Sequence, residues 1–175
     1  MVWMLSRLYK PGKSCDTTRV YEIEEYAFYD CVNLKEVVIP DSVTWAAGTS
    51  FLNTPWLDSQ TDEFVTIGDG VLIAYRGKET KVVVPDGVKY IGGEVFGDGI
   101  EEITLPESVI AFDEYAFKNC SDLKNVIIKG NATREKNESK GIISKLSWIH
   151  FTVPGDSALI SRFEEWDIQY DILRE

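Results

Sequence analysis

The chain has 175 residues, of which 44% are hydrophobic and 27% charged, a composition that fits one globular domain with a sizeable core. Its net charge of -11 repels phosphate backbones and anionic headgroups, so nucleic acid and membrane surfaces are poor partner candidates. No apolar run approaches the roughly 20 residues of a membrane span, and no signal peptide is visible because Arg7 interrupts the apolar start. We therefore expect no membrane insertion.

The first segment, Met1–Thr18, does not follow the pattern of the rest of the chain. Val2, Trp3 and Leu5 are apolar, and Pro11-Gly12 then breaks the segment. Two interpretations stay open: an N-terminal cap that covers the first rung of a stack, or the remnant of an earlier repeat.

The stretch Val20–Pro40 sets a pattern that returns along the chain. Four valines each stand eight residues before a phenylalanine: Val20, Val43, Val88 and Val109 precede Phe28, Phe51, Phe96 and Phe117. Four in-phase copies at this spacing are typical of a solenoid, in which each unit stacks on the next.

The second half of each unit predicts a strand. It contains Cys31, Leu34, Val37, Ile39 and Pro40 in the first unit, and returns as Cys120, Leu123, Val126, Ile128 and Lys129 in the last full one. Alternate apolar positions indicate a strand with one buried face, and a proline lacks the N–H that would continue the ladder. Lys129 stands where the other units have proline.

These residues resemble the BspA-like leucine-rich repeats, whose unit reads roughly V-x-x-I-x-x-x-A-F-x-x-C-x-x-L-x-x-V-x-I-P. The resemblance covers Val20 to about Pro154 and the segment that follows it. It implies a β-rich solenoid, a right-handed leucine-rich-repeat superhelix of about five rungs. The departures are Ala46, Thr54 in place of the cysteine, a shortened turn at Gly97-Asp98-Gly99, and Lys129.

The second unit carries an insertion between Phe51 and the strand that ends at Pro85. Within it, Phe64–Ile67 and Val71–Tyr75 flank Gly68-Asp69-Gly70, which predicts a β-hairpin. A similar insertion recurs in the resembled family, where it is structural.

The end of the chain predicts a helix followed by a strand. Asp156 or Ser157 is a candidate N-cap for a helix that ends near Trp166, and Asp167–Leu173 alternates like a strand. This ending is similar to the family's C-terminal cap, so we expect Glu175 near a true end. The predicted organisation is one domain over 1–175, with an N-terminal cap or truncated repeat over 1–18, repeats over 19–154 and a cap over 155–175.

No catalytic or metal constellation is predicted, and no cofactor. The only histidine, His150, has no nucleophile signature near it, and adjacent carboxylates such as Glu101-Glu102 point to opposite faces of a strand. The acidic run Asp58–Glu63 lacks the glycine that a calcium loop needs at its sixth position. We expect a non-enzymatic chain without a metal site.

The three cysteines form no zinc or disulfide pattern. Cys31 and Cys120 share a repeat position that predicts an inward side chain, and they lie too many rungs apart to bond. Cys15 is the candidate for an exposed thiol. Asn131 and Asn137 stand in glycosylation sequons, which matter only in a secreted eukaryotic chain.

The best candidate site is the outward face of the repeat strands, on the concave side that solenoids present. The outward positions are Glu36 and Val38, Lys81 and Val83, Glu102 and Thr104, Asn125 and Ile127, and His150 and Thr152. Their central column is entirely β-branched, which indicates either a binding ridge or plain strand propensity.

The resemblance implies a non-enzymatic protein-protein interaction module that is cell-surface or secreted, with an adhesin as one form; a cytoplasmic location stays open. Two alternatives remain: a passive structural scaffold or fragment of a larger surface protein, and a carbohydrate-binding module using the aromatic insertion around Trp56, Phe64 and Tyr75.

Overall fold

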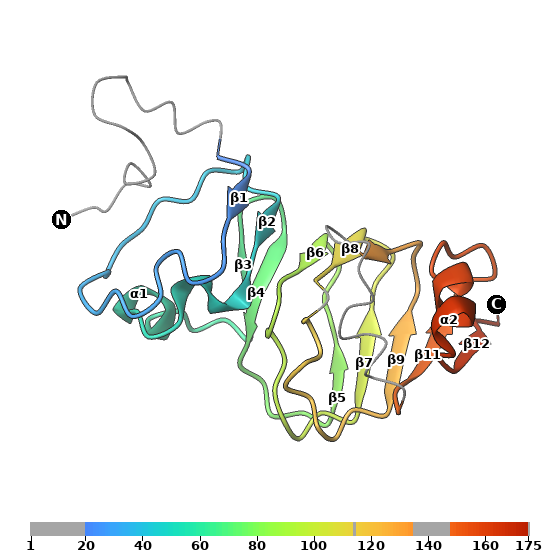
Figure 1. Ribbon diagram of the computed structural model, residues 1–175. Coiled ribbons are helices and arrows are strands. Elements are labelled where there is room, and N and C mark those ends of the chain that lie inside the picture. Colours follow the sequence, from blue (N-terminus) through green and yellow to red (C-terminus); the bar gives the residue numbers. More distant parts are fainter. Residues whose placement is uncertain (1–19, 114, 135–147, 175) are drawn as a thin grey trace.

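A computed structural model describes residues 20–113, 115–134 and 148–174. The chain coils into a β-solenoid of about six turns, in which strands of successive turns line up in parallel sheets (Figure 1). Residues 1–18, Cys15 and Asn137 lie outside the described residues, so the alternatives for the N-terminal segment stay open.

Each turn contributes a short strand to one wall of the solenoid. These strands form a two-stranded sheet, β1-β2, and a five-stranded sheet in the order β10-β8-β6-β4-β3. Their bounds are β1 Glu22–Ile23, β2 Trp45–Ala46, β3 Phe64–Ile67, β4 Val71–Tyr75, β6 Tyr90–Ile91, β8 Ala111–Phe112 and β10 Thr133–Arg134. The repeat position three residues after each valine is buried here: Ile23, Ala46, Ile91 and Phe112 are at most 1% exposed. The predicted phase of the repeat is confirmed.

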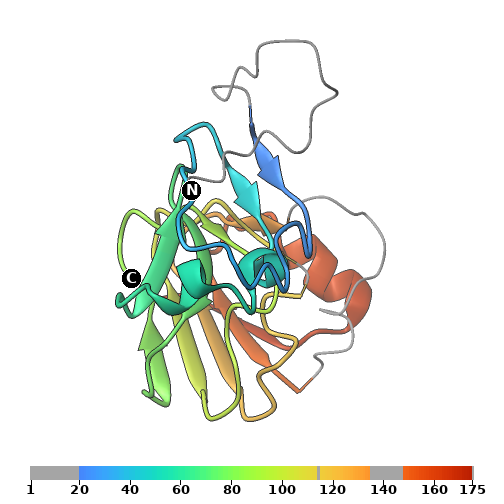
Figure 2. The same ribbon diagram turned by 90° about the vertical axis from the view of Figure 1, so that its left-hand side faces the viewer.

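The opposite wall is a five-stranded parallel sheet in the order β12-β11-β9-β7-β5. Its strands are β5 Lys81–Val83, β7 Glu102–Leu105, β9 Asn125–Ile128, β11 His150–Val153 and β12 Tyr170–Ile172. In Figure 1 β5, β7, β9 and β11 stand side by side in chain order, and Figure 2 looks along the stack from the end that holds β1 and α1. Inward residues such as Ile103, Val126 and Phe151 are fully buried between the walls.

The insertion forms the predicted hairpin, and it also takes a place in the stack. β3 and β4 pair antiparallel, while β4 pairs in parallel with β6, so that Leu72 lies opposite Ile91. The stack therefore gains a turn over the expected five rungs. Val71 and Ile73 belong to the core cluster of the first units and Leu72 to the larger cluster beyond, so β4 joins the two.

A short 3-10 helix, η3 Gly48–Phe51, and a short helix, α1 Pro55–Asp58, follow β2. Thr54, which replaces the repeat cysteine, is fully buried and caps α1 by accepting a hydrogen bond from the Leu57 N–H at 3.1 Å. The Trp56 N–H donates to the Leu34 carbonyl at 2.8 Å. The departure at Thr54 therefore marks where the second unit leaves the repeat path.

The last described elements are the expected helix and strand. Helix α2 spans Ile160–Trp166 and begins after Leu159, not at Asp156 or Ser157. The Ser157 hydroxyl instead accepts from the Leu159 N–H at 3.3 Å, within the turn before the helix. Phe163 packs against Phe151 with ring centroids 4.9 Å apart, which fixes α2 over the final turn.

Candidate functional site

The outward residues of four neighbouring strands form two columns in exact register across the sheet. Each residue of a column lies opposite the next one on the neighbouring strand, in the order β5, β7, β9 and β11. The first column is Lys81, Glu102, Asn125 and His150, and the second is Val83, Thr104, Ile127 and Thr152. The inward neighbours are buried, while Val83 is 65% exposed and the other members of its column are half-buried. Eight of the ten predicted site residues therefore lie together on one surface, which we call the sheet face.

Glu36 and Val38 are not part of the sheet face, and this prediction is wrong. Val38 is 65% exposed, yet its stretch holds only the bridge residue Val37 and joins none of the sheets that the described residues form. The next unit does not supply the neighbouring strand, because its chain turns into α1 beside Leu34 and then into the β3–β4 hairpin. The sheet consequently begins at β5.

Polar contacts between neighbouring strands lie at both ends of the first column of the sheet face. The Lys81 ammonium lies 3.4 Å from the Glu102 carboxylate, which links β5 to β7. At the other end, Nε2 of His150 lies 3.0 Å from Oδ2 of Asp171, which links β11 to β12. Exposed pairs of this kind stabilise the fold little, so they show which side chains are neighbours on this surface and do not fix their positions.

Asp171 is a sheet-face residue that the sequence did not point out. It lies opposite Thr152 because β12 pairs in parallel with β11. The alternation from Asp167 to Leu173 does predict a strand, but a short strand carries no signal of its neighbour. The sheet face therefore extends over five strands.

No metal or catalytic cluster accompanies these columns in the described part of the chain. Residues 20–113, 115–134 and 148–174 contain no group of three His, Cys, Asp or Glu side chains arranged to hold a metal ion. Among the described residues, the side-chain hydrogen bond of His150 goes to Asp171 and not to a hydroxyl or thiol. Such an arrangement can present charges and shape to a ligand.

The two described cysteines differ in burial. Cys120 is 1% exposed, and burial, reinforced by the Asp98 charge, raises the pKa of its thiol to about 12. Cys31 is exposed, so its predicted inward position is wrong. The reason is that the matching position of the next unit is Thr54, which turns into α1 instead of continuing the wall over Cys31.

The aromatic rings of the insertion are packed, not displayed. Trp56 lies against Phe51 with centroids 4.5 Å apart, and Tyr75 contacts both Phe64 and Phe96. Trp56, Phe64 and Tyr75 are half-buried and pack against the two core clusters, so they offer less ring surface to a sugar than exposed rings would. The carbohydrate alternative stays a prediction.

Of the two predicted glycosylation residues, Asn131 lies in the described chain, and its side chain makes a hydrogen bond within the fold. Asn131 is exposed, and its Oδ1 accepts from the Ala158 N–H at 3.1 Å. Its carboxamide thus joins the turn after β9 to the turn before α2.

Stacked parallel turns with a solvent-facing sheet define a repeat protein of the interaction-module class, in which a surface and not a cleft meets the ligand. The family model described as BspA type leucine rich repeat region matches the chain in 6 copies, over residues 15–72 and 65–154. The chain belongs to this family, whose members are protein-interaction repeat modules, generally non-enzymatic and typically surface-associated.

The other comparisons add no relatives: no curated protein and no solved structure gives a significant match. Among the described residues, no helix has the length and apolar character needed to cross a membrane.

Proposed function

We propose that the sheet face is a non-enzymatic binding surface for a protein partner. The observation that carries the proposal is the column Val83, Thr104, Ile127 and Thr152, which stands in register across four strands. Its branched side chains point away from the core, and the exposed Val83 extends an apolar strip that water must cover in the free protein.

The flanking column supports the same surface. Lys81 and His150 each lie within 3.4 Å of a carboxylate from the neighbouring strand. A strip of branched side chains beside polar and charged groups has the composition of a protein interface with a hydrophobic centre and a polar rim.

The family's usual surface association supports a further part of the proposal: the protein acts outside the cell or on its surface, with adhesion as one such role. Protease treatment of intact cells tests this part. Loss of the protein from intact cells supports a surface location, and protection until lysis contradicts it.

Lysine substitutions on the strip test the binding proposal itself. V83K and I127K place charges in the column without touching the core, so the fold should persist. Proteins captured by the wild-type chain should be lost from both variants and kept by I110K, where an exposed isoleucine lies next to β8 in the other sheet. Equal capture by folded V83K, I127K and wild type would contradict the proposal.

A further inference from the structure

An open depression lies at the carboxyl ends of β5, β7 and β9, where the sheet face meets the following turns. Its volume is about 520 Å³. Val83, Pro85 and Pro106 supply its apolar lining, and Asp86, Glu107 and Lys129 supply its charges. Each charged residue comes from a different turn, so the depression exists only because the turns are stacked.

The three charged side chains that line the depression are exposed to solvent. Lys81 pairs with Glu102 and Lys124 with Glu101, each within 3.4 Å. Within the described chain, no ion pair involves Asp86, Glu107 or Lys129. The depression therefore offers two carboxylates and one ammonium whose charges are not neutralised by a neighbour.

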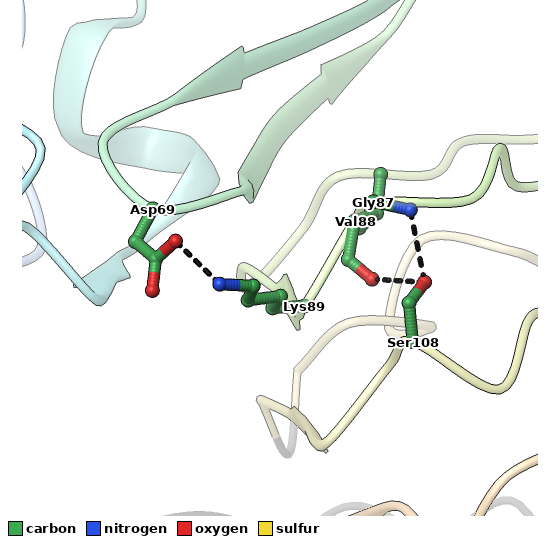
Figure 3. A network of polar contacts seen from close by, with 5 residues as sticks. All are labelled: Asp69, Gly87, Val88, Lys89 and Ser108. Carbon is green, nitrogen blue, oxygen red and sulfur yellow. Dashed lines mark hydrogen bonds and ion pairs between the residues drawn. The ribbon is translucent and has the colours of Figure 1, made fainter.

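The turns that carry these charges are fixed to one another. Ser108 accepts a hydrogen bond from the Gly87 N–H at 3.1 Å and donates to the Val88 carbonyl at 2.9 Å (Figure 3). On the other side, a Cβ added to Gly130 would lie 2.7 Å from the Glu107 carbonyl oxygen, so the next turn lies directly against that of Glu107. These contacts set the spacing of the turns that carry Asp86, Glu107 and Lys129.

Lys129 breaks the repeat at this place. The equivalent positions in the neighbouring units are Pro85 and Pro106, and both line the same depression. The two ends of the depression therefore differ in charge. The carboxylates of Asp86 and Glu107 come from the turns after β5 and β7, and the ammonium of Lys129 comes from the turn after β9.

We infer that this depression binds an extended segment of a partner protein in which a lysine or arginine adjoins an aliphatic residue. The inference rests on the proposed function and names the partner's chemistry. The cation lies between Asp86 and Glu107, the aliphatic side chain lies on Val83 and Pro106, and Lys129 receives a carbonyl or carboxylate oxygen.

Dimensions and charge support this occupant. Three strand ends span about 10 Å at roughly 4.8 Å per strand, which matches about three residues of extended chain at roughly 3.3 Å each. The net charge of -11 attracts cationic segments from a distance and repels acidic ones. A cationic segment therefore gains both long-range attraction and two local carboxylate partners.

The test uses two labelled peptides, Ac-Gly-Val-Arg-Val-Gly-NH2 and its glutamate counterpart, with fluorescence anisotropy and amide NMR spectra of the full chain. We expect the arginine peptide to bind, to shift the resonances of Asp86 and Glu107, and to bind about tenfold more weakly to the D86N/E107Q variant. The control E165Q changes an exposed carboxylate in α2 and should bind like wild type.

Every other outcome overturns the inference. Equal affinity for the two peptides, unchanged affinity of folded D86N/E107Q, or resonance shifts confined to another surface contradicts the proposed segment. Displacement of the peptide by arginine amide at the same concentration would show that the site binds a small cation and does not recognise a protein segment. Protein capture that depends on Ile127 while the arginine peptide fails would remove this inference and leave the proposed function standing.

Discussion

The rings of Phe96 and Phe117 stack with centroids 6.1 Å apart and planes inclined by only 9°. They occupy the same position in neighbouring turns, as Phe28 and Phe51 do at the other end of the described stack, with centroids 5.1 Å apart. Stacked rings at the same repeat position thus connect the first two units and, further along the chain, the units of Phe96 and Phe117.

Removing a fully buried ring at this repeat position should destabilise the fold strongly. Phe117 is 1% exposed, so F117A should lower the free energy of unfolding by about 3–5 kcal/mol. Phe28 is only half-buried, and F28A should cost clearly less. Urea unfolding followed by circular dichroism measures both; equal losses would contradict a cost set by the burial of the ring.

Gly92 allows its turn to pack closely against β2 and β4. A Cβ at Gly92 would lie 2.6 Å from the Ala46 carbonyl oxygen and 3.0 Å from that of Leu72, whereas one at Gly97 would meet nothing within 4 Å. G92A should therefore lower the unfolding free energy by about 1–3 kcal/mol. G97A should change it by less than about 1 kcal/mol. Thermal unfolding compares the two, and a harmless G92A would refute the close approach of these turns.

The Glu94–Lys118 contact should make stability depend on pH. The hydrogen bond from Lys118, with a further one from Asn119, holds the pKa of Glu94 below its ordinary value. A carboxyl whose pKa is lower in the folded state contributes stability that is complete above its unfolded pKa of about 4.3 and is lost as the pH falls through the folded pKa.

E94Q should accordingly be less stable than wild type near neutral pH and indistinguishable from it in strong acid. Urea unfolding across that range measures the difference. In a K118M background the pH dependence of the difference should shrink, because the first cause of the lowered pKa is gone. A difference that grows as the pH falls would contradict the sign of this linkage.

Thiol reactivity should separate the two described cysteines. Burial raises the pKa of the Cys120 thiol to about 12, so almost no thiolate forms at mildly alkaline pH, while Cys31 is exposed. In a C15S background, iodoacetamide should label Cys31 alone, as peptide mass spectrometry will show. Cys120 should react only after denaturation; rapid labelling of native Cys120 would contradict its burial.

The repeat could be predicted from the sequence because its signals are local and redundant. Four copies of a valine and phenylalanine at one spacing fix which residues face inward, and Ile91, Phe112 and Phe117 are buried accordingly. The same alternation fixes the outward columns of β5, β7, β9 and β11.

What the sequence did not predict depends on contacts between distant units. Whether Val38 joins the sheet depends on where the following turn passes, and that turn is diverted by Thr54, whose capping of α1 is not apparent from one residue. The role of β4 as a member of the stack likewise depends on its pairing with β6, and Asp171 reaches the sheet face only through the pairing of β12.

The measurement that tests the binding surface most directly is site-specific photocrosslinking. Thr104 lies at the centre of the sheet face, and replacing it with benzoylphenylalanine places a reactive group within reach of any protein bound there. We predict crosslinked protein adducts from position 104 and none from the same group at position 110, which lies next to β8 in the other sheet. Adducts from position 110 alone, or equally from both, would contradict a binding surface on the outer face of β5, β7, β9 and β11.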